Sequence, residues 1–277
     1  MTFVALVLLQ GLPDPASYGD RIEIRRDIAF GAEPRRKLDL YRPRGDGPFP
    51  VVVCWFGGGF TQGSRAGMAR VASFLAAEGF AAAAPEYFLA NADEGRPGWP
   101  RNLHDAKAAV RFLRSQAASL KLDGRRMAGL GSSSGSWLAM MTAFTPDRPD
   151  LDDPSADGTS TALQAVVNIA GVVDRRGGFG TGTRHLLGEG YAQKPELRAL
   201  ASPLLHASAQ SPPVYTLHGL RDEEVTPDSA RRLDACLREL GVEHRLNWVP
   251  EAGHQPMSAE ALFEIACWLY GMLGSCK

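Results

Sequence analysis

A continuous apolar run over residues 49–56 constrains the fold of this chain more than any other feature. A strand with one face in water alternates apolar and polar residues, whereas a run that is apolar throughout is typical of a strand covered on both faces. Similar runs recur at residues 80–84, 127–130, 165–170 and 214–217, with helical patterns between them. This alternation predicts an α/β fold with a mostly parallel central sheet and helices on both faces.

Two stretches that precede this run have a different pattern. Residues 21–24 and 37–41 alternate apolar and polar positions, as half-buried antiparallel strands do. A last strand is expected over 245–249, and helices over 66–78, 102–120, 137–144, 227–240 and 258–273. Residues 145–161 and 174–212 fit neither pattern, and long insertions of this kind supply lids, substrate walls or solvated loops. We therefore expect one domain over residues 21–277 that carries a small insertion.

The composition excludes several classes of protein. The chain has 277 residues, of which 44% are hydrophobic and 22% charged, as in soluble proteins that bury a sizeable core. Lys and Arg number 30 and acidic residues 31, so the net charge of −1 argues against nucleic acid as a partner. Four scattered cysteines are too few for a disulfide scaffold or a zinc site. Cys54 reads as a buried hydrophobe, and a bridge between Cys236 and Cys267 stays open.

The N-terminal segment, residues 1–20, is apolar over residues 3–9 and is then broken by glycine and proline. The apolar run is too short for a membrane span. It resembles the core of a secretory signal, but no Lys or Arg precedes it and no clear cleavage site follows it. The alternative is an apolar segment that lies on the domain. Secretion, a periplasmic location and a cytoplasmic one therefore all stay open.

A serine flanked by glycines lies between the strand at 127–130 and the helix at 137–144. In the sequence Gly131-Ser132-Ser133-Ser134-Gly135, only Ser133 has glycine two residues before and two residues after it. A nucleophile on a sharp strand-to-helix turn needs this spacing, because side chains at those positions would collide. The N–H of Ser134, at the helix start, would then face a developing oxyanion. The alternative is a turn that is merely rich in serine and glycine.

Three consecutive glycines, Gly57 to Gly59, directly follow the buried strand at 49–56. Their backbone N–H groups are unshielded and could be aimed at the carbonyl oxygen of a substrate. This place in the chain order, before the first long helix, is where a second oxyanion donor belongs. The alternative is a flexible glycine turn.

A nucleophilic serine needs a histidine base, which in turn needs an orienting carboxylate. In this architecture both follow the serine, each just beyond a strand end, with the acid before the histidine. Asp222 follows the strand at 214–217, and His254 follows the strand at 245–249. Glu223 and Glu224 compete with Asp222, which is favoured because it comes first after the turn. His218 ends its strand and is expected to hold the turn through a hydrogen bond.

Several aromatic residues are predicted close to this site. Phe60, Trp137 and Tyr87 follow or flank the buried strands and could line an acyl or aryl pocket. As bulky residues beside buried strands, they fit a core position at least as well.

At these residues the chain resembles the α/β-hydrolase superfamily. Within it, the chain looks closest to bacterial esterases that are hormone-sensitive-lipase-like or feruloyl/acetylxylan-esterase-like (BD-FAE-like). The matching segments are Leu38–Pro43, Gly57–Gly59, His104–Leu113, Gly131–Gly135, Ser202–Leu204, His218–Asp222 and Gly253–His254. Three positions depart from the family: Phe56 replaces a histidine that braces the glycine loop, Ser133-Ser134-Gly135-Ser136 replaces Ser-Ala-Gly-Gly, and Tyr87-Phe88-Leu89 replaces Tyr-Arg-Leu. Phe56 must therefore brace the loop by packing.

This resemblance implies an α/β-hydrolase fold with an insertion near the active site, and a serine hydrolase of carboxylic esters. The substrate would be a small molecule, a short-chain, aryl or acetyl ester that could be linked to a carbohydrate. Ser133, Asp222 and His254 would form the catalytic triad. The N–H groups of Gly58, Gly59 and Ser134 would form the oxyanion hole. No metal or organic cofactor is implied.

Two other functions are compatible with the same residues. One is hydrolysis of an amide bond, by a peptidase or an arylformamidase, because the same triad serves both bonds. The other is a hydrolase-fold binding protein whose triad is idle, which the altered elbow and Phe56 suggest. Labelling by a serine-directed phosphonate discriminates between an active and an idle site.

Overall fold

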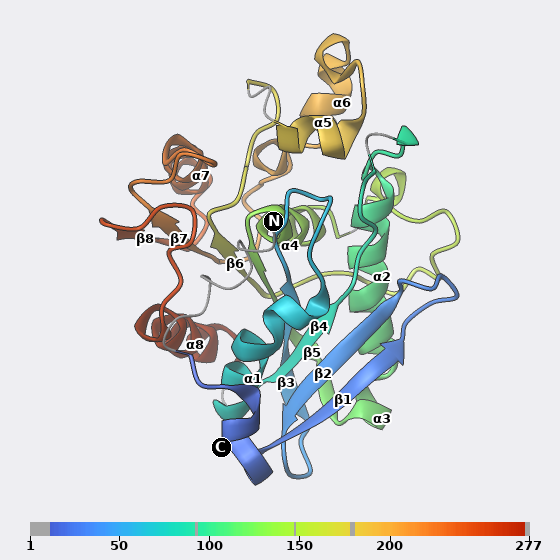
Figure 1. Ribbon diagram of the computed structural model, residues 1–277, viewed down its shortest axis with the longest axis vertical. Coiled ribbons are helices and arrows are strands. Elements are labelled where there is room, and N and C mark those ends of the chain that lie inside the picture. The colour runs from blue at the N-terminus through green and yellow to red at the C-terminus, as the bar shows by residue number, and fades with distance from the viewer. Residues whose placement is uncertain (1–11, 92–93, 147, 178–180, 275–277) are drawn as a thin grey trace.

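An eight-stranded sheet forms the centre of the computed structural model, which describes residues 12–91, 94–146, 148–177 and 181–274. The strand order is β1-β2-β4-β3-β5-β6-β7-β8 (Figure 1). The strands are β1 (Ile22–Ala29), β2 (Lys37–Pro43), β3 (Phe49–Trp55), β4 (Ala81–Pro85), β5 (Leu122–Ser132), β6 (Ala165–Ile169), β7 (Val214–Gly219) and β8 (His244–Val249). β2 pairs antiparallel with both neighbours, and all pairs from β4 to β8 are parallel. The predicted α/β class is confirmed.

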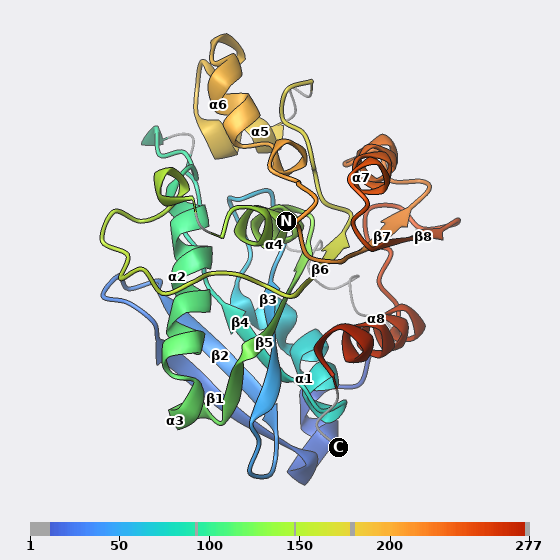
Figure 2. The same ribbon diagram turned by 180° about the vertical axis from the view of Figure 1, so that it is seen from behind.

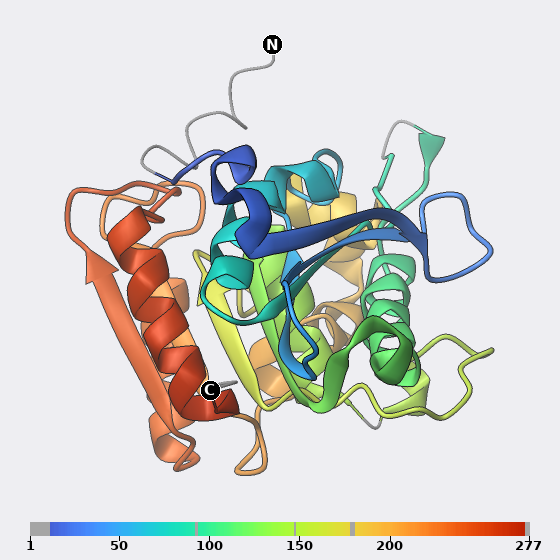
Figure 3. The ribbon, with the colours of Figure 1, turned by 90° about the horizontal axis from the view of Figure 1, so that it is seen from below.

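Four of the inner strands are buried at every position, whereas β5 is buried at Leu122 and over residues 127–131. All residues of β3, β4, β6 and β7 are buried. The helices are α1 (Ala69–Ala77), α2 (Arg101–Ser115), α3 (Ala117–Leu120), α4 (Ser134–Phe144), α5 (Thr181–Leu187), α6 (Pro195–Leu200), α7 (Asp228–Glu239) and α8 (Ala259–Leu273). Seen from below, α1 and α8 lie on one side of the sheet and α2 on the other (Figure 3). A sheet covered in this way buries both faces.

Element boundaries differ from the sequence prediction in several helices, and α4 begins at Ser134 and not at Trp137. The helix expected over 66–78 starts as a 3-10 turn at Arg65–Met68, and α1 begins only at Ala69. The helix expected over 102–120 divides at Gln116 into α2 and the one-turn α3. Lys121 then ends α3 in the left-handed region with φ 58°. Short-range capping and backbone strain decide such ends, and apolar periodicity does not report them.

The two irregular insertions occupy different places. Residues 174–212 supply α5 and α6, which lie above the carboxyl ends of the strands (Figure 1). Residues 145–161 instead run beside α2 (Figure 2). Only the first insertion therefore borders the edge of the sheet where β5 ends at the serine turn.

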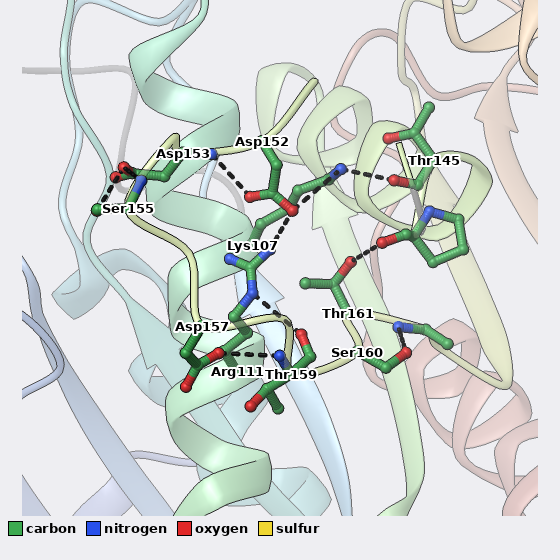
Figure 4. Close-up of polar contacts among 12 residues, drawn as sticks. Lys107, Arg111, Thr145, Asp152, Asp153, Ser155, Asp157, Thr159, Ser160 and Thr161 are labelled. Carbon is green, nitrogen blue, oxygen red and sulfur yellow. Dashed lines mark hydrogen bonds and ion pairs between the residues drawn. The ribbon is translucent and has the colours of Figure 1, made fainter. Parts of the chain in front are cut away.

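Two basic residues of α2 hold the second insertion in place (Figure 4). The fully buried ammonium of Lys107 donates to the carbonyl of Thr145 at 2.6 Å. Arg111 donates to the carbonyl of Thr159 at 3.0 Å and pairs with Asp152. The Asp152 carboxylate also lies 3.9 Å from Lys107 Nζ. Burial lowers the pKa of Lys107 to about 8, and the charge of Asp152 acts in the opposite direction.

Asp152→Ala is expected to lower the free energy of unfolding by about 3 kcal/mol. The substitution removes the carboxylate that faces two buried cations, and a buried charge without its partner is costly. Urea denaturation followed by circular dichroism measures the change. Asp157→Ala is the matched control, because Asp157 lies in the same insertion but is exposed. An equal denaturation midpoint for the two variants would show that Asp152 is not what holds the insertion.

The structure describes part of the N-terminal segment and three of the four cysteines. Residues 1–11 of the predicted N-terminal segment lie outside the described residues, whereas Leu12 and Tyr18 are buried against the domain. None of the helices in the described ranges is long and apolar enough to cross a membrane. Cys54 is buried, as expected, and the open alternative of a Cys236–Cys267 bridge is not realised, since both are free thiols.

Candidate active site

Ser133 stands on a strained turn between β5 and α4. Its backbone has φ 53° and ψ −117°, which a residue with a side chain rarely adopts. Its N–H donates to the carbonyl of Ile169 at 2.8 Å, which ties the turn to β6. The flanking glycines are sterically required. A Cβ on Gly131 would lie 2.2 Å from the backbone of Gly135, and a Cβ on Gly135 would lie 2.1 Å from the carbonyl of Trp55.

Ser136 braces the same turn through its hydroxyl. The Oγ atom donates to the carbonyl of Gly131 at 2.6 Å and accepts from the N–H of Ile169 at 2.8 Å. The sequence showed this residue only as a departure from glycine. Its partners come from two strands, and local sequence carries no signal for such a contact.

The structure brings Ser133, His254 and Asp222 together in one hydrogen-bonded chain. The Nε2 atom of His254 lies 2.9 Å from Ser133 Oγ, and its Nδ1 atom lies 2.8 Å from Asp222 Oδ2. His254 follows β8 and Asp222 follows β7, so the carboxyl ends of adjacent parallel strands bring them to one edge. This geometry is that of a nucleophile, a base and an orienting acid.

Asp222 is held as a charged group. Its Oδ1 atom accepts the N–H groups of Glu224 and Val225, each at 2.9 Å. His218 lies 3.3 Å from Asp222 Oδ2 and 2.8 Å from the carbonyl of Val225, so it holds the turn as expected. Burial acts to raise the pKa of Asp222, but its hydrogen bonds with His218 and His254 outweigh burial and keep the pKa well below the ordinary range.

The competing carboxylates do not take the orienting position. Glu224 lies 3.8 Å from the Nε2 atom of His254, on the side of Ser133 and not of Nδ1. Its side chain is 72% exposed, whereas that of Asp222 is fully buried. Glu223 is exposed as well. A buried acid is better suited to fix an imidazole, because water does not compete for its oxygens.

The glycine loop lies directly beside the serine turn. A Cβ on Gly57 would lie 3.2 Å from the Cβ of Ser133. Gly58 and Gly59 have φ 131° and 60°, and among the described residues their N–H groups have no hydrogen-bond acceptor. The N–H of Ser134 is the first of α4 and is likewise unpaired within the helix. All three residues adjoin the serine turn, and their N–H groups stay the predicted oxyanion donors.

Phe56 braces this loop by packing, as its replacement of histidine predicts. Its ring stacks on that of Tyr87, with centroids 4.3 Å apart and planes 19° from parallel. The Tyr87 hydroxyl donates to the Phe56 carbonyl at 3.0 Å. A stacked ring and one hydrogen bond therefore hold the residue that precedes the glycines.

The three aromatic residues proposed for a substrate pocket lie in the core. Tyr87 and Trp137 are fully buried and Phe60 is 1% exposed. Phe60 meets Trp137 edge to face at 5.4 Å, and Trp137 Nε1 donates to the carbonyl of Ala201 at 2.8 Å. The pocket assignment is corrected accordingly: these rings pack beneath the site and do not form an accessible wall. Full burial of a large aromatic ring contributes more to the stability of the fold than a half-exposed position does.

Across the part of the chain that the structure describes, His, Cys, Asp and Glu side chains form no group of three that could hold a metal ion.

Several proteins of similar sequence or structure are named as esterases. Esterase LipC of Mycobacterium tuberculosis is 29% identical over 244 residues, which cover 83% of this chain and 59% of LipC. A truncated carbohydrate esterase from gut microbiota superposes with a TM-score of 0.82 at 20% identity, covering 92% of this chain and 98% of that one. A bifunctional GH43-CE protein of Bacteroides eggerthii reaches 0.83 at 26% identity, covering 91% of this chain and 38% of that one.

The chain spans only about half to three fifths of the length of the curated relatives it matches. Residues 38–237 match the BD-FAE family, and this segment includes all but the first residue of β2, the strands β3 to β7 and most of α7. The resemblance inferred from the motifs is confirmed. Since the match covers well over half of its residues, this chain belongs to the BD-FAE family of α/β-hydrolases.

Proposed function

We propose that this protein hydrolyses carboxylic esters, with Ser133 as nucleophile, His254 as general base and Asp222 as orienting acid. The observation that carries the proposal is the chain of hydrogen bonds from Ser133 Oγ through His254 to Asp222, on a strained turn. The esterases among the relatives and structural neighbours support the same reaction class. A binding protein would have no need to hold a serine in this conformation.

The proposed reaction has two halves. Ser133 Oγ attacks the ester carbonyl while His254 Nε2 takes the hydroxyl proton. The N–H groups of Gly58, Gly59 and Ser134 stabilise the negative charge that develops on the carbonyl oxygen. His254 then gives its proton to the departing alcohol, which leaves an acyl group on Ser133. Water, deprotonated by His254, attacks this acyl-enzyme and releases the acid.

Packing around the serine supports a short acyl group. Phe60 and Trp137 fill the space next to the glycine loop and the first turn of α4. A long acyl chain would have to displace one of these rings, and opening a packed core costs several kcal/mol. Acetyl or similarly small acyl groups require no such movement.

A substrate panel tests the proposal. p-Nitrophenyl esters from acetate to decanoate, methyl ferulate and p-nitroacetanilide are assayed with the parent protein and Ser133→Ala. Serine-dependent hydrolysis that is fastest with the short esters is expected. Faster cleavage of the anilide would make the protein an amidase. If no substrate is hydrolysed and a fluorophosphonate does not label Ser133, the site is catalytically idle.

The activity is expected to fall as the pH drops through the pKa of His254. Burial acts to lower this pKa, but the hydrogen bond and charge of Asp222 outweigh burial and hold it above the ordinary value of about 6.5. The base works only as neutral imidazole, so the acid limb of kcat/KM should lie above that pH.

Asp222→Asn should move this acid limb to lower pH, because it removes the charge that raises the pKa of His254. The rate on the plateau should fall about 10⁴-fold. Glu224→Gln is the control: Glu224 also raises the pKa of His254, but it is exposed and more weakly coupled, so the limb should move less. A larger shift with Glu224→Gln than with Asp222→Asn would contradict the assignment of the acid.

A further inference from the structure

Arg175, in the loop that follows β6, has a buried guanidinium without a carboxylate partner. The residue is 4% exposed, and its guanidinium forms no ion pair with a described residue. Nη1 donates to the hydroxyl of Thr183 at 3.3 Å, while Nε is buried with no acceptor. Nη2 makes no hydrogen bond to a described residue. The fork of donors is therefore largely unused.

Among the described residues, the two other buried arginines both have an acidic partner, unlike Arg175. Arg42 pairs with Glu23 at 2.6 Å, and Arg111 pairs with Asp152. Arg176, the next residue after Arg175, pairs with Asp174 at 2.8 Å. Burial lowers the pKa of Arg175 to about 10, so the group still carries its charge at neutral pH. A buried charge that lacks an anion is costly, and it persists only where something compensates for the cost.

The guanidinium lies next to the proposed oxyanion loop. Its Cζ atom is 5.3 Å from the centroid of the Phe60 ring, and Phe60 directly follows Gly59. The same ring contacts Trp137, which lies on the first turn of α4 after Ser133. The N–H of Arg175 donates to Ser202 Oγ at 2.8 Å, which fixes its backbone. The face of the Phe60 ring therefore partly compensates the charge of Arg175, and the same ring separates this cation, which has no anionic partner among the described residues, from the loop that would hold the substrate carbonyl.

We propose that Arg175 binds a carboxylate carried by the substrate, so that the preferred substrates are esters with a free acidic group. This inference rests on the proposed ester hydrolysis and names its substrate class. Guanidinium donors match the two oxygens of a carboxylate, and in a dry site such a charge-assisted pair is strong. Arg175 takes no covalent part: the ester and water still yield an acid and an alcohol at Ser133.

Matched ester pairs test the preference on the parent protein, without any substitution. p-Nitrophenyl hemiglutarate and p-nitrophenyl valerate have acyl chains of equal length and differ in the terminal carboxylate. 4-Acetoxybenzoate and p-tolyl acetate place the same difference on the alcohol side. After subtraction of uncatalysed hydrolysis, one pair is expected to show a kcat/KM at least about 10-fold higher for the anion. Equal or lower values for the anion in both pairs would overturn the proposal.

Arg175→Met and Arg175→Lys then test which residue is responsible. Arg175→Met should lower the ratio of anionic to neutral kcat/KM about 30-fold and leave the neutral ester within about 3-fold. Arg175→Lys keeps the positive charge but loses the paired N–H donors of the guanidinium, so its ratio of anionic to neutral kcat/KM should be intermediate. Arg176→Met, in the same loop with a half-exposed and paired guanidinium, should leave the ratio unchanged. An Arg175→Met variant that slows both esters equally would mean that Arg175 only holds α5 over the core.

A binding measurement separates failure of this inference from failure of the proposed function. Calorimetric titration of glutarate and 4-hydroxybenzoate into folded Ser133→Ala should show binding that Arg175→Met in the same background loses. Neutral-ester hydrolysis with neither anion preference nor anion binding would overturn the inference alone. No hydrolysis and no fluorophosphonate labelling of the parent would overturn the proposed function, whatever Arg175 binds.

Discussion

Ser133→Ala is expected to lower kcat for every ester that the parent protein cleaves, by at least about 10⁴-fold. Alanine keeps the turn but removes the only atom placed to attack the carbonyl. His254 Nε2 would lose the hydroxyl that donates to it, and the remaining oxyanion donors could stabilise only attack by water. Steady-state kinetics with p-nitrophenyl acetate, together with intact-protein mass spectrometry after fluorophosphonate treatment, measures both turnover and acylation.

Ser132→Ala is the matched control for this variant. Ser132 precedes the proposed nucleophile and is also partly exposed, but it has no hydrogen bond to His254. It should keep the parent's phosphonate labelling and most of the parent's activity. Near-parental rates in Ser133→Ala, or labelling that disappears in Ser132→Ala and persists in Ser133→Ala, would place the nucleophile elsewhere.

Gly135→Ala is expected to lower the free energy of unfolding by at least about 3 kcal/mol. The added Cβ would lie 2.1 Å from the carbonyl oxygen of Trp55 and 2.6 Å from that of Phe56. Both contacts are with backbone atoms at the end of β3, and neither can rotate away. Relief requires α4 to move off the sheet, which would also shift Ser133. Chemical denaturation gives the stability, and the residual kcat reports the displacement of the turn.

Gly271→Ala is the matched control, and it is expected to raise the free energy of unfolding where Gly135→Ala lowers it. Gly271 lies in α8, and a Cβ there would meet nothing within 4 Å. Alanine is the better helix former, so this variant should be more stable by about 0.5–1 kcal/mol. A Gly135→Ala variant as stable as Gly271→Ala would show that α4 has more freedom than its contact with β3 indicates.

The sequence was sufficient for the fold class because that class depends on local periodicity. Runs such as residues 49–56 are apolar at every position only when both faces are covered, and the structure buries all of β3. The order of Ser133, Asp222 and His254 also followed from the chain, because parallel strands bring their carboxyl ends to one edge. Motif spacing thus predicted which side chains meet.

The sequence was less informative wherever a side chain could be placed in two ways. Phe60, Trp137 and Tyr87 were compatible with a pocket wall or with the core, and the rings proved to be packed together. The hydroxyl of Ser136 bridges two strands that are joined only in the folded sheet. Such contacts depend on segments far apart in the chain, and no local pattern encodes them.

By itself the sequence determined the doubly covered sheet, the glycine-flanked turn at Ser133 and the family. Each of these depends on the period or spacing of neighbouring residues, which steric rules convert directly into local geometry. Only the tertiary structure decided that Phe60, Trp137 and Tyr87 are core residues and that Arg175 is buried without an acidic partner among the described residues. The physical reason is that burial and charge pairing are properties of the space between distant segments, which exists only once the chain has folded.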